Sequence, residues 1–180
     1  MTTNPSEHES TRIVITDANI LINLFIANDL PLLSRIPGNS FVVCPEVLSE
    51  LLKDGIRQAA QTALDDGDIS AVSIDSIAEL QTFAELRAIM GLGEAASLAL
   101  AKHRGFLLAS DEKKVFLREA LSRLGEKRLI TTPDIYVLAI RARVISVEYA
   151  DNAKRVLERN RFRMGFGSFS ELVSEEFGRA

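Results

Sequence analysis

The sequence has few of the residues on which nucleophilic catalysis and covalent cross-linking depend. It contains one cysteine, two histidines and no tryptophan in 180 residues. The single cysteine, Cys44, excludes an internal disulfide, and its apolar neighbours predict a small buried hydrophobe rather than a reactive thiol. His8 lies in the polar start of the chain, and His103 is expected at the C-terminal end of a helix, where it favours the helix dipole. The sequence therefore offers no Ser-His-Asp or Cys-His arrangement.

Long apolar runs are also absent. No run approaches the ~18–20 residues that a membrane-spanning helix needs. The first ten residues are polar, with no basic segment followed by an apolar one, so we expect neither a secretory signal nor membrane association. We expect a cytoplasmic protein, with residues 1–11 forming a disordered tail.

Charge is distributed unevenly along the chain, although the net charge is only −4. Residues 1–100 contain 5 basic and 14 acidic side chains, whereas residues 101–180 contain 16 basic and 11 acidic ones. An acidic half beside a basic half fits a site that holds cations next to a flank that holds phosphates. An uneven, solvated surface explains the same count.

Short apolar segments alternate with helical ones. Strands are predicted at residues 12–16, 40–44, 69–74, 106–110 and 127–131. Helices are predicted at residues 18–28, 45–55, 56–67, 75–91, 93–105, 112–125 and 132–144. Strands that are apolar on both faces are typical of a parallel sheet covered by helices on both sides. We therefore predict an α/β fold, a three-layer α/β/α domain with a mostly parallel five-stranded sheet over residues 12–145, followed by a C-terminal helical extension over residues 146–180.

Four acidic residues are expected near one edge of this sheet. Asp17 ends the first strand and Asp111 directly follows the fourth, while Glu94 begins a helix and Glu50 lies one turn into another. Ligands of open parallel sheets bind at the carboxyl ends of the strands. Crowded carboxylates raise one another's pKa values unless a cation neutralises them, and oxygen ligands of this kind suit Mg²⁺ or Mn²⁺. Such ions activate water for phosphodiester hydrolysis.

Each of these acids also has a simpler interpretation. Asp17 and Asp111 could cap helices, Glu94 could favour a helix dipole, and Glu50 could be a solvated helix residue. Glu46, one helical turn before Glu50, could take its place.

Two further acids lie close by in the sequence. Asp134, in Thr-Thr-Pro-Asp, is predicted to favour a helix dipole after a Thr132 cap and Pro133. Glu112 is predicted to point outward.

Three motifs together resemble the PIN-domain family of metal-dependent ribonucleases, which includes the toxins of many bacterial toxin–antitoxin pairs. They are IVITDANILINLF, VVCPEVLSELL and GLGEAASLALAKHRGFLLASDEKKV, and the resemblance covers residues 12–145. It implies a metal site formed by Asp17, Glu50, Glu94 and Asp111, supported by Asn19 and Ser110. The family branch often carries two Asp where this chain has Asp111-Glu112, and a Gly-Thr step where it has ITTPD.

Basic residues near these motifs are candidates for RNA contacts. Three of them follow Asp111, the last of the four candidate acids: Lys113, Lys114 and Arg118. The family branch often has a basic residue a few positions after this acid, and Lys114 or Arg118 could serve as that residue. RNRFRMGFGSF interleaves Arg161 and Arg163 with phenylalanine, a mixture that stacks bases and binds phosphates. The same phenylalanines could instead attach the extension to the core.

These observations predict a Mg²⁺- or Mn²⁺-dependent endoribonuclease, with RNA as substrate, an antitoxin protein as a further partner, and a homodimer as a further option. The first alternative is a catalytically silent PIN-like module that binds RNA or protein. The second is a receiver-like α/β domain, which would need paired acids after the first strand and a lysine after the fifth, and this chain has neither.

Overall fold

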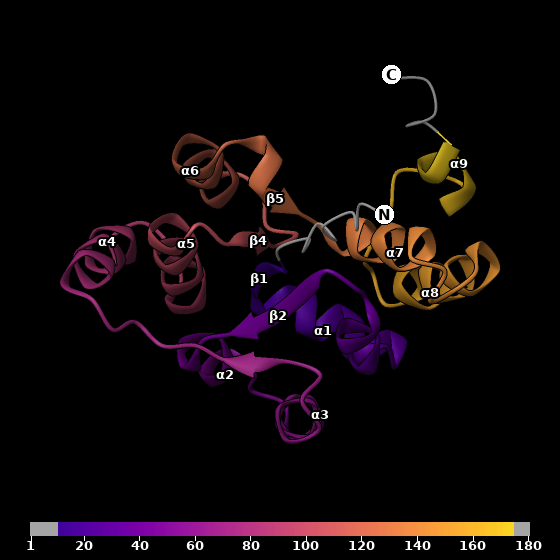
Figure 1. Ribbon diagram of the computed structural model, residues 1–180, viewed down its shortest axis with the longest axis horizontal. Helices are drawn as coiled ribbons and strands as arrows, with labels where there is room; N and C mark the ends of the chain where they lie inside the picture. Colours follow the sequence, from indigo (N-terminus) through magenta and orange to yellow (C-terminus); the bar gives the residue numbers. More distant parts are fainter. Residues whose placement is uncertain (1–10, 175–180) are drawn as a thin grey trace, which may run out of the picture.

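The centre of the fold is a five-stranded sheet. The computed structural model describes residues 11–174, so the expected tail lies outside the described residues except for Thr11. The strands are β1 (Arg12–Thr16), β2 (Asn39–Val43), β3 (Ser70–Ala71), β4 (Leu107–Ala109) and β5 (Leu129–Ile130). All neighbouring pairs are parallel, in the order β3-β2-β1-β4-β5 (Figure 1). The predicted α/β class and strand number are confirmed, and the sheet is parallel throughout.

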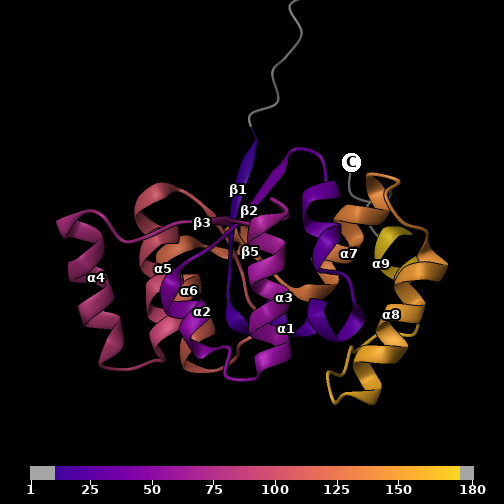
Figure 2. The ribbon, with the colours of Figure 1, turned by 90° about the horizontal axis from the view of Figure 1, so that it is seen from below.

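Helices cover both faces of the sheet. They are α1 (Ala18–Ala27), α2 (Pro45–Glu50), α3 (Asp54–Asp65), α4 (Ile77–Arg87), α5 (Leu92–Arg104), α6 (Val115–Leu124), α7 (Thr132–Arg141), α8 (Val147–Arg159) and α9 (Phe169–Ser174), with short 3-10 helices η1 (Leu30–Arg35) and η2 (Glu126–Arg128). Figure 2 shows α5 on one side of the sheet, with α4 outside it, and α1 and α7 on the other, with α8 outside them. No helix within residues 11–174 combines the length and apolarity needed to cross a membrane.

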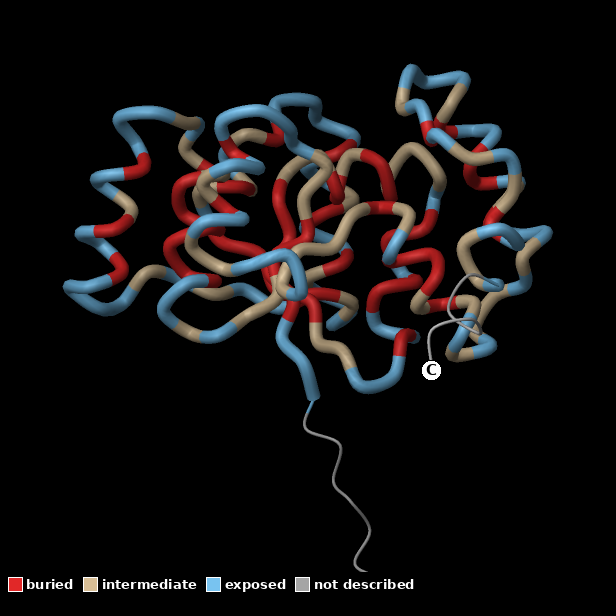
Figure 3. Tube along the Cα trace, turned by 90° about the horizontal axis from the view of Figure 1, so that it is seen from above, coloured by how far each residue is buried: buried red, intermediate tan, exposed pale blue. Residues whose placement is uncertain are grey.

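The buried core follows the central strands and the helix α5. Val14 and Ile15 in β1 are fully buried, as is every residue of the alanine-rich stretch 95–101 in α5. Figure 3 shows the buried residues in red, concentrated in the interior of the molecule. Alanine side chains allow α5 to lie close to the sheet on one side while α2, α4 and α6 pack around it. Cys44 is fully buried as predicted, and burial raises the pKa of its thiol to about 11.

Helix α2 is shorter than predicted and ends at Glu50 rather than near residue 55. The chain turns at Leu51 before α3 begins at Asp54. The Arg57 side chain holds this turn, because its Nε donates to the Leu51 carbonyl (3.2 Å) and its Nη2 to the Leu52 carbonyl (3.3 Å). The turn leaves Glu50 at the end of a helix beside α5 instead of in the middle of one.

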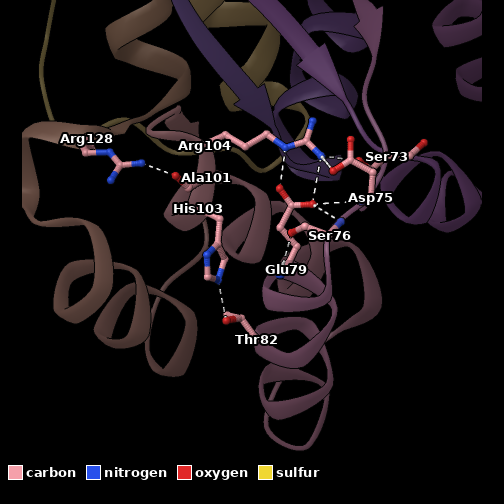
Figure 4. A network of polar contacts seen from close by, with 9 residues as sticks. All are labelled: Ser73, Asp75, Ser76, Glu79, Thr82, Ala101, His103, Arg104 and Arg128. Carbon is pink, nitrogen blue, oxygen red and sulfur yellow. Dashed lines mark hydrogen bonds and ion pairs between the residues drawn. The ribbon is translucent and has the colours of Figure 1, made fainter.

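A polar network joins the C-terminal end of α5 to the start of α4 (Figure 4). Arg104 donates to both carboxylate oxygens of Glu79, at 2.6 and 3.0 Å, and lies 3.0 Å from Asp75. Glu79 is only 3% exposed, and its hydrogen bonds with Arg104 lower its pKa to about 2. His103 lies in the last turn of α5, as predicted, and shares a 2.8 Å hydrogen bond with Thr82 of α4.

The C-terminal helices are attached to the core by two aspartates. Asp29, which is 3% exposed, accepts hydrogen bonds from the hydroxyls of Tyr136 in α7 (2.6 Å) and Tyr149 in α8 (2.5 Å). Asp151 in α8 accepts from the Phe169 amide (2.8 Å), at the start of α9. Phe169 is fully buried, so α8 and α9 are packed onto the domain rather than loosely appended.

Candidate active site at the sheet edge

The candidate site lies where the direction of the sheet connections reverses. The chain runs outward from β1 to β2 and β3, and then places β4 and β5 on the other side of β1. The Asp17 amide donates to the Ala109 carbonyl (3.0 Å), so Asp17 and Ser110 leave neighbouring strands side by side. This is the position at which open parallel sheets bind their ligands.

The carboxylate of Asp17 has two roles. Its Oδ1 accepts from the Ala18 amide (2.8 Å) and caps α1. Its Oδ2 accepts from Asn19 Nδ2 (3.0 Å) and Ser110 Oγ (3.0 Å). The expected cap and the expected site residue are therefore the same side chain, and Asn19 and Ser110 fix its direction.

Burial and like charges act together on Asp17. The residue is 2% exposed, and burial raises its pKa to about 6. Hydrogen bonds from Ala18 and Ser110 oppose this increase, and the negative charges of Glu94 and Glu112 add to it. Both glutamates are therefore within electrostatic reach of Asp17.

Glu50 and Glu94 meet around two glycines at the start of α5. Glu94 accepts from the Gly91 amide (2.9 Å), and Glu50 accepts from the Gly93 amide (2.9 Å). A Cβ on Gly91 would lie 3.4 Å from Glu94 Oε2 and 3.5 Å from Glu50 Oε1. A Cβ on Gly93 would lie 2.5 Å from Glu50 Oε2, so the Gly-x-Gly-Glu motif leaves room for two carboxylates.

Asp111 has a different environment from the other three predicted acids. Its Oδ1 accepts from the Thr132 amide (2.9 Å), and its Oδ2 accepts from Thr132 Oγ1 (2.5 Å) and Asn23 Nδ2 (2.9 Å). Burial raises the pKa of Asp111, and these hydrogen bonds oppose the increase. Both oxygens are therefore engaged in joining the β4–α6 loop to α1 and α7.

Glu112 differs from its expected outward orientation. The residue is exposed, yet its Oε1 accepts from Asn19 Nδ2 (3.1 Å), which also donates to Asp17. The Glu112 amide donates to Ser110 Oγ (3.1 Å), and the Asp111 amide donates to Asn19 Oδ1 (3.1 Å). Asn19 thus places Glu112, rather than the Asp111 carboxylate, next to Asp17.

Of the remaining acids, Asp134 forms a capping box with Thr131, not with the expected Thr132. Its carboxylate accepts from the Thr131 amide at 2.7 Å. Glu46 lies in the first turn of α2, and its charge is among the causes that raise the Cys44 pKa. Neither residue belongs to the hydrogen-bonded group around Asp17.

Sequence reasoning missed three polar participants: Asn23, Thr132 and Glu112. Asn23 did have a signal, because it is a polar residue in an otherwise apolar helix and lies four positions after Asn19, on the same helix face. It is 6% exposed and bonds Asp111 and Thr132.

The donor set suits a divalent metal in its chemistry. Asp17, Glu50, Glu94 and Glu112 supply only carboxylate oxygens, which hard cations prefer. Within residues 11–174, no group of three or more Asp, Glu, His or Cys side chains lies close enough together to hold a metal ion without rearrangement. None of the ion pairs in the same stretch involves these four acids or Asp111. Among the described residues these carboxylates therefore have no ion-pair partner, and a bound cation would supply the positive charge.

The predicted RNA-contacting residues fall into two groups, and all five are exposed. Lys113 and Arg163 line one groove next to Ser110 and Glu112. The others lie outside its lining: Lys114, with a φ of 58°, precedes α6, Arg118 lies 3.3 Å from Glu119, and Arg161 has a φ of 71°.

Comparison with known proteins gives a family for this chain. Residues 13–167 match the family described as DUF3368: PIN domain, and the match continues beyond residue 145 through α8. None of the curated proteins compared with the chain matches it. Among solved structures it is similar to PAE2754 from Pyrobaculum aerophilum, with 16% identity, coverage of 81% of this chain and 99% of that one, and a TM-score of 0.46. Since the family match spans most of the sequence, this chain belongs to the PIN-domain family, whose members are typically nucleases that use divalent metals.

Proposed function

We propose that this chain is an endoribonuclease that hydrolyses RNA phosphodiester bonds with a water activated by Mg²⁺ or Mn²⁺. One observation carries the proposal: near the reversal point of the sheet, Asp17 is affected by the charges of Glu94 and Glu112, and Glu94 lies with Glu50 beside Gly91. The described residues give these acids no ion pair. Burial is the main cause of the raised pKa of Asp17, and the negative charges of Glu94 and Glu112 add to it.

In this proposal the chain's own residues hold and orient the reacting groups. Asp17, Glu50, Glu94 and Glu112 are the candidate metal ligands, and Asp111 would contribute only if it gave up bonds with Thr132 and Asn23. A bound Mg²⁺ or Mn²⁺ would supply the positive charge that activates water and stabilises the leaving oxygen. Ser110 and Asn19 fix the Asp17 carboxylate, so its position is set before substrate binds.

A catalytically silent PIN module that binds RNA or protein is the second candidate. The position of Asp111 favours it, because the polar groups of Thr132 and Asn23 occupy both carboxylate oxygens. In that case Asp111 would be a structural residue, and three of the four acids expected from the family pattern would remain.

Cleavage of total cellular RNA tests the first proposal against the second. We expect discrete cuts with Mn²⁺ that disappear with a chelator and in Asp17→Asn. Asparagine caps a helix as well as aspartate does, so α1 should be preserved. Asp134→Asn is the matched control, since this acid lies near the same edge but forms a capping box. Equal cutting by wild type and Asp17→Asn would exclude the assigned site.

A toxin role is the finer part of the proposal, and it rests on the family resemblance. We expect production of the chain in cells to arrest growth, and a partner encoded by a small upstream reading frame to relieve the arrest. Growth arrest by Asp17→Asn would separate toxicity from cleavage and contradict this part.

A further inference from the structure

A groove of about 430 Å³ borders the candidate ligands Asp17, Glu50, Glu94 and Glu112, which we call the acid cluster, and it shares Glu112 with them. Its walls come from the β4–α6 loop, the first turn of α6, the start of α7 and residues 162–166. Ser110 and Glu112 belong to both places: they line the groove, and they are hydrogen-bonded to Asp17 and Asn19. Whatever occupies the groove therefore lies directly beside the candidate cleavage site.

The far wall of the groove is apolar and partly uncovered. Leu117 of α6 is 39% exposed, and Phe162 and Phe166 face the same space from the segment after α8. Apolar surface of this kind favours the flat face of an aromatic ring. Most of the lining is apolar, and its charged members are Asp111, Glu112 and Lys113 in the β4–α6 loop and Arg163 in the segment after α8.

The aromatic wall is held in place by the core. Phe166 packs edge-on against the buried Phe169, with ring centroids 5.0 Å apart, and Lys154 Nζ lies 5.5 Å from its centroid. The Phe162 amide donates to the Leu157 carbonyl (3.0 Å). The groove is therefore preformed, and an occupant need not order it.

Two basic side chains lie at the groove, together with two of the acids, Asp111 and Glu112, that border the candidate site. Lys113 and Arg163 are exposed members of its lining. Within residues 11–174, Lys113 makes no ion pair with an acid, so its charge is available to a phosphate. Apolar walls with cations beside them match a nucleotide, which has an apolar ring and an anionic phosphate.

We propose that this groove is a nucleobase subsite, which holds an unpaired base of the RNA strand whose phosphodiester lies at the acid cluster. The inference rests on the proposed function and deepens it by naming the surface of this chain that holds a base next to the cut. A base can enter the groove only when it is free of its helix, because bases in a duplex stay stacked and paired. A protein segment would gain from the apolar wall, but it would not need the cations or the neighbouring acids.

Two leucines of α6 provide a matched test. Leu117 lines the groove, and Leu121, one turn further on, is 41% exposed but outside its lining. We would place Leu117→Glu and Leu121→Glu separately in an Asp17→Asn background. Fluorescence anisotropy would then measure binding of a short single-stranded oligoribonucleotide and of its blunt duplex in Mg²⁺. Leu117→Gln in the same background separates loss of apolar contact from charge repulsion, and urea unfolding checks that the variants fold.

The expected result is a loss of roughly tenfold or more in single-strand affinity for Leu117→Glu, a smaller loss for Leu117→Gln, and no more than about a twofold change for Leu121→Glu. The duplex should bind more weakly than the single strand. Equal affinities for Leu117→Glu and Leu121→Glu, or tighter binding of the duplex, would overturn the proposal and leave a protein segment as the occupant of the groove.

Cleavage by the single variants separates this proposal from the proposed function. Cleavage that is equal in Leu117→Glu and Leu121→Glu would reject the subsite and leave the nuclease assignment standing. No cleavage by wild type, together with a selective loss of single-strand binding in Leu117→Glu, would keep the subsite and reject the nuclease.

Discussion

The two ends of α5 place carboxylates in opposite situations. At the C-terminal end, the buried Glu79 receives two hydrogen bonds from Arg104, and its pKa falls to about 2. At the N-terminal end, Glu94 and Glu50 lie side by side, and the nearby Asp17 has its pKa raised to about 6. Glu79 is paired with a cation of the chain, whereas within residues 11–174 the other three carboxylates form no ion pair.

This difference separates structural from functional acids without reference to sequence motifs. A buried acid that has an internal cation depends on that partner, because removing the cation leaves an uncompensated buried charge. Crowded acids without one destabilise the metal-free protein, and such sites are where catalytic and metal-binding groups are found. Asp111 lies between the two cases, because neutral donors rather than a cation satisfy it.

The largest expected effect comes from removing the Asp17 charge. Asp17→Asn should lower RNA cleavage by on the order of 1000-fold, equivalent to about 4 kcal/mol of transition-state stabilisation. Its free energy of unfolding in chelator should equal or exceed that of wild type, because a crowded charge is lost. Cleavage rates and urea unfolding measure the two quantities. An Asp17→Asn variant that cleaves RNA like wild type and is less stable than wild type would contradict both expectations.

The next effect comes from removing the cation at the other end of α5. Arg104→Met leaves Glu79 buried without its partner, and we expect a loss of about 3 kcal/mol in the free energy of unfolding. Arg87→Met, at the exposed end of α4, should cost less than about 1 kcal/mol. If urea unfolding gave the same loss of stability for Arg104→Met and Arg87→Met, the fold would not depend on the buried pair more than on an exposed arginine.

The two ends should also respond oppositely to pH. The folded pKa of Glu79 is depressed, so the stability that it contributes is present above its unfolded pKa and is lost as the pH falls toward 2. The folded pKa of Asp17 is raised, so its contribution is present below 3.8 and is lost as the pH rises through about 6 in chelator. Wild type should therefore lose stability relative to Asp17→Asn between pH 4 and 7, while its advantage over Glu79→Gln should grow between pH 2 and 5. If the stability of wild type relative to each variant changed with pH in the same direction, the opposite roles of Asp17 and Glu79 would be contradicted.

The smallest effect concerns the intermediate case. Thr132→Val removes one hydroxyl donor from Asp111 and should cost about 1–2 kcal/mol in urea unfolding. Cleavage should fall less than tenfold if Asp111 is mainly structural. A loss of activity as large as that of Asp17→Asn would place Asp111 with the catalytic acids.

The number of strands, the parallel sheet and the burial of β1 followed from the sequence, because short apolar runs alternate with helices and turn residues mark their ends. The strand order did not, because the sequence pattern does not show which strands are neighbours. The end of α2 did not, because the side chain of Arg57 holds the turn at Leu51. The sequence shows that residues 159–169 are rich in phenylalanine, but it does not predict the groove. The surface of α6 that faces these residues lies more than 40 residues away along the chain.

For the site, residue types pointed to the sheet edge, but spacing could not orient the side chains. Asp111 and Glu112 are adjacent, so their order along the chain does not show which one faces Asp17. Asn19 and Thr132 decide this by hydrogen bonding, and Thr132 belongs to a segment 21 residues further on.

The central claim is that the acids near the N-terminal end of α5 bind a divalent cation, and a measurement of Mn²⁺ binding tests it most directly. Isothermal titration calorimetry would compare wild type, Asp17→Asn and Asp134→Asn. We expect saturable binding by wild type and Asp134→Asn that is lost or strongly weakened in Asp17→Asn. Binding that is equal in all three, or absent from wild type, would contradict the claim.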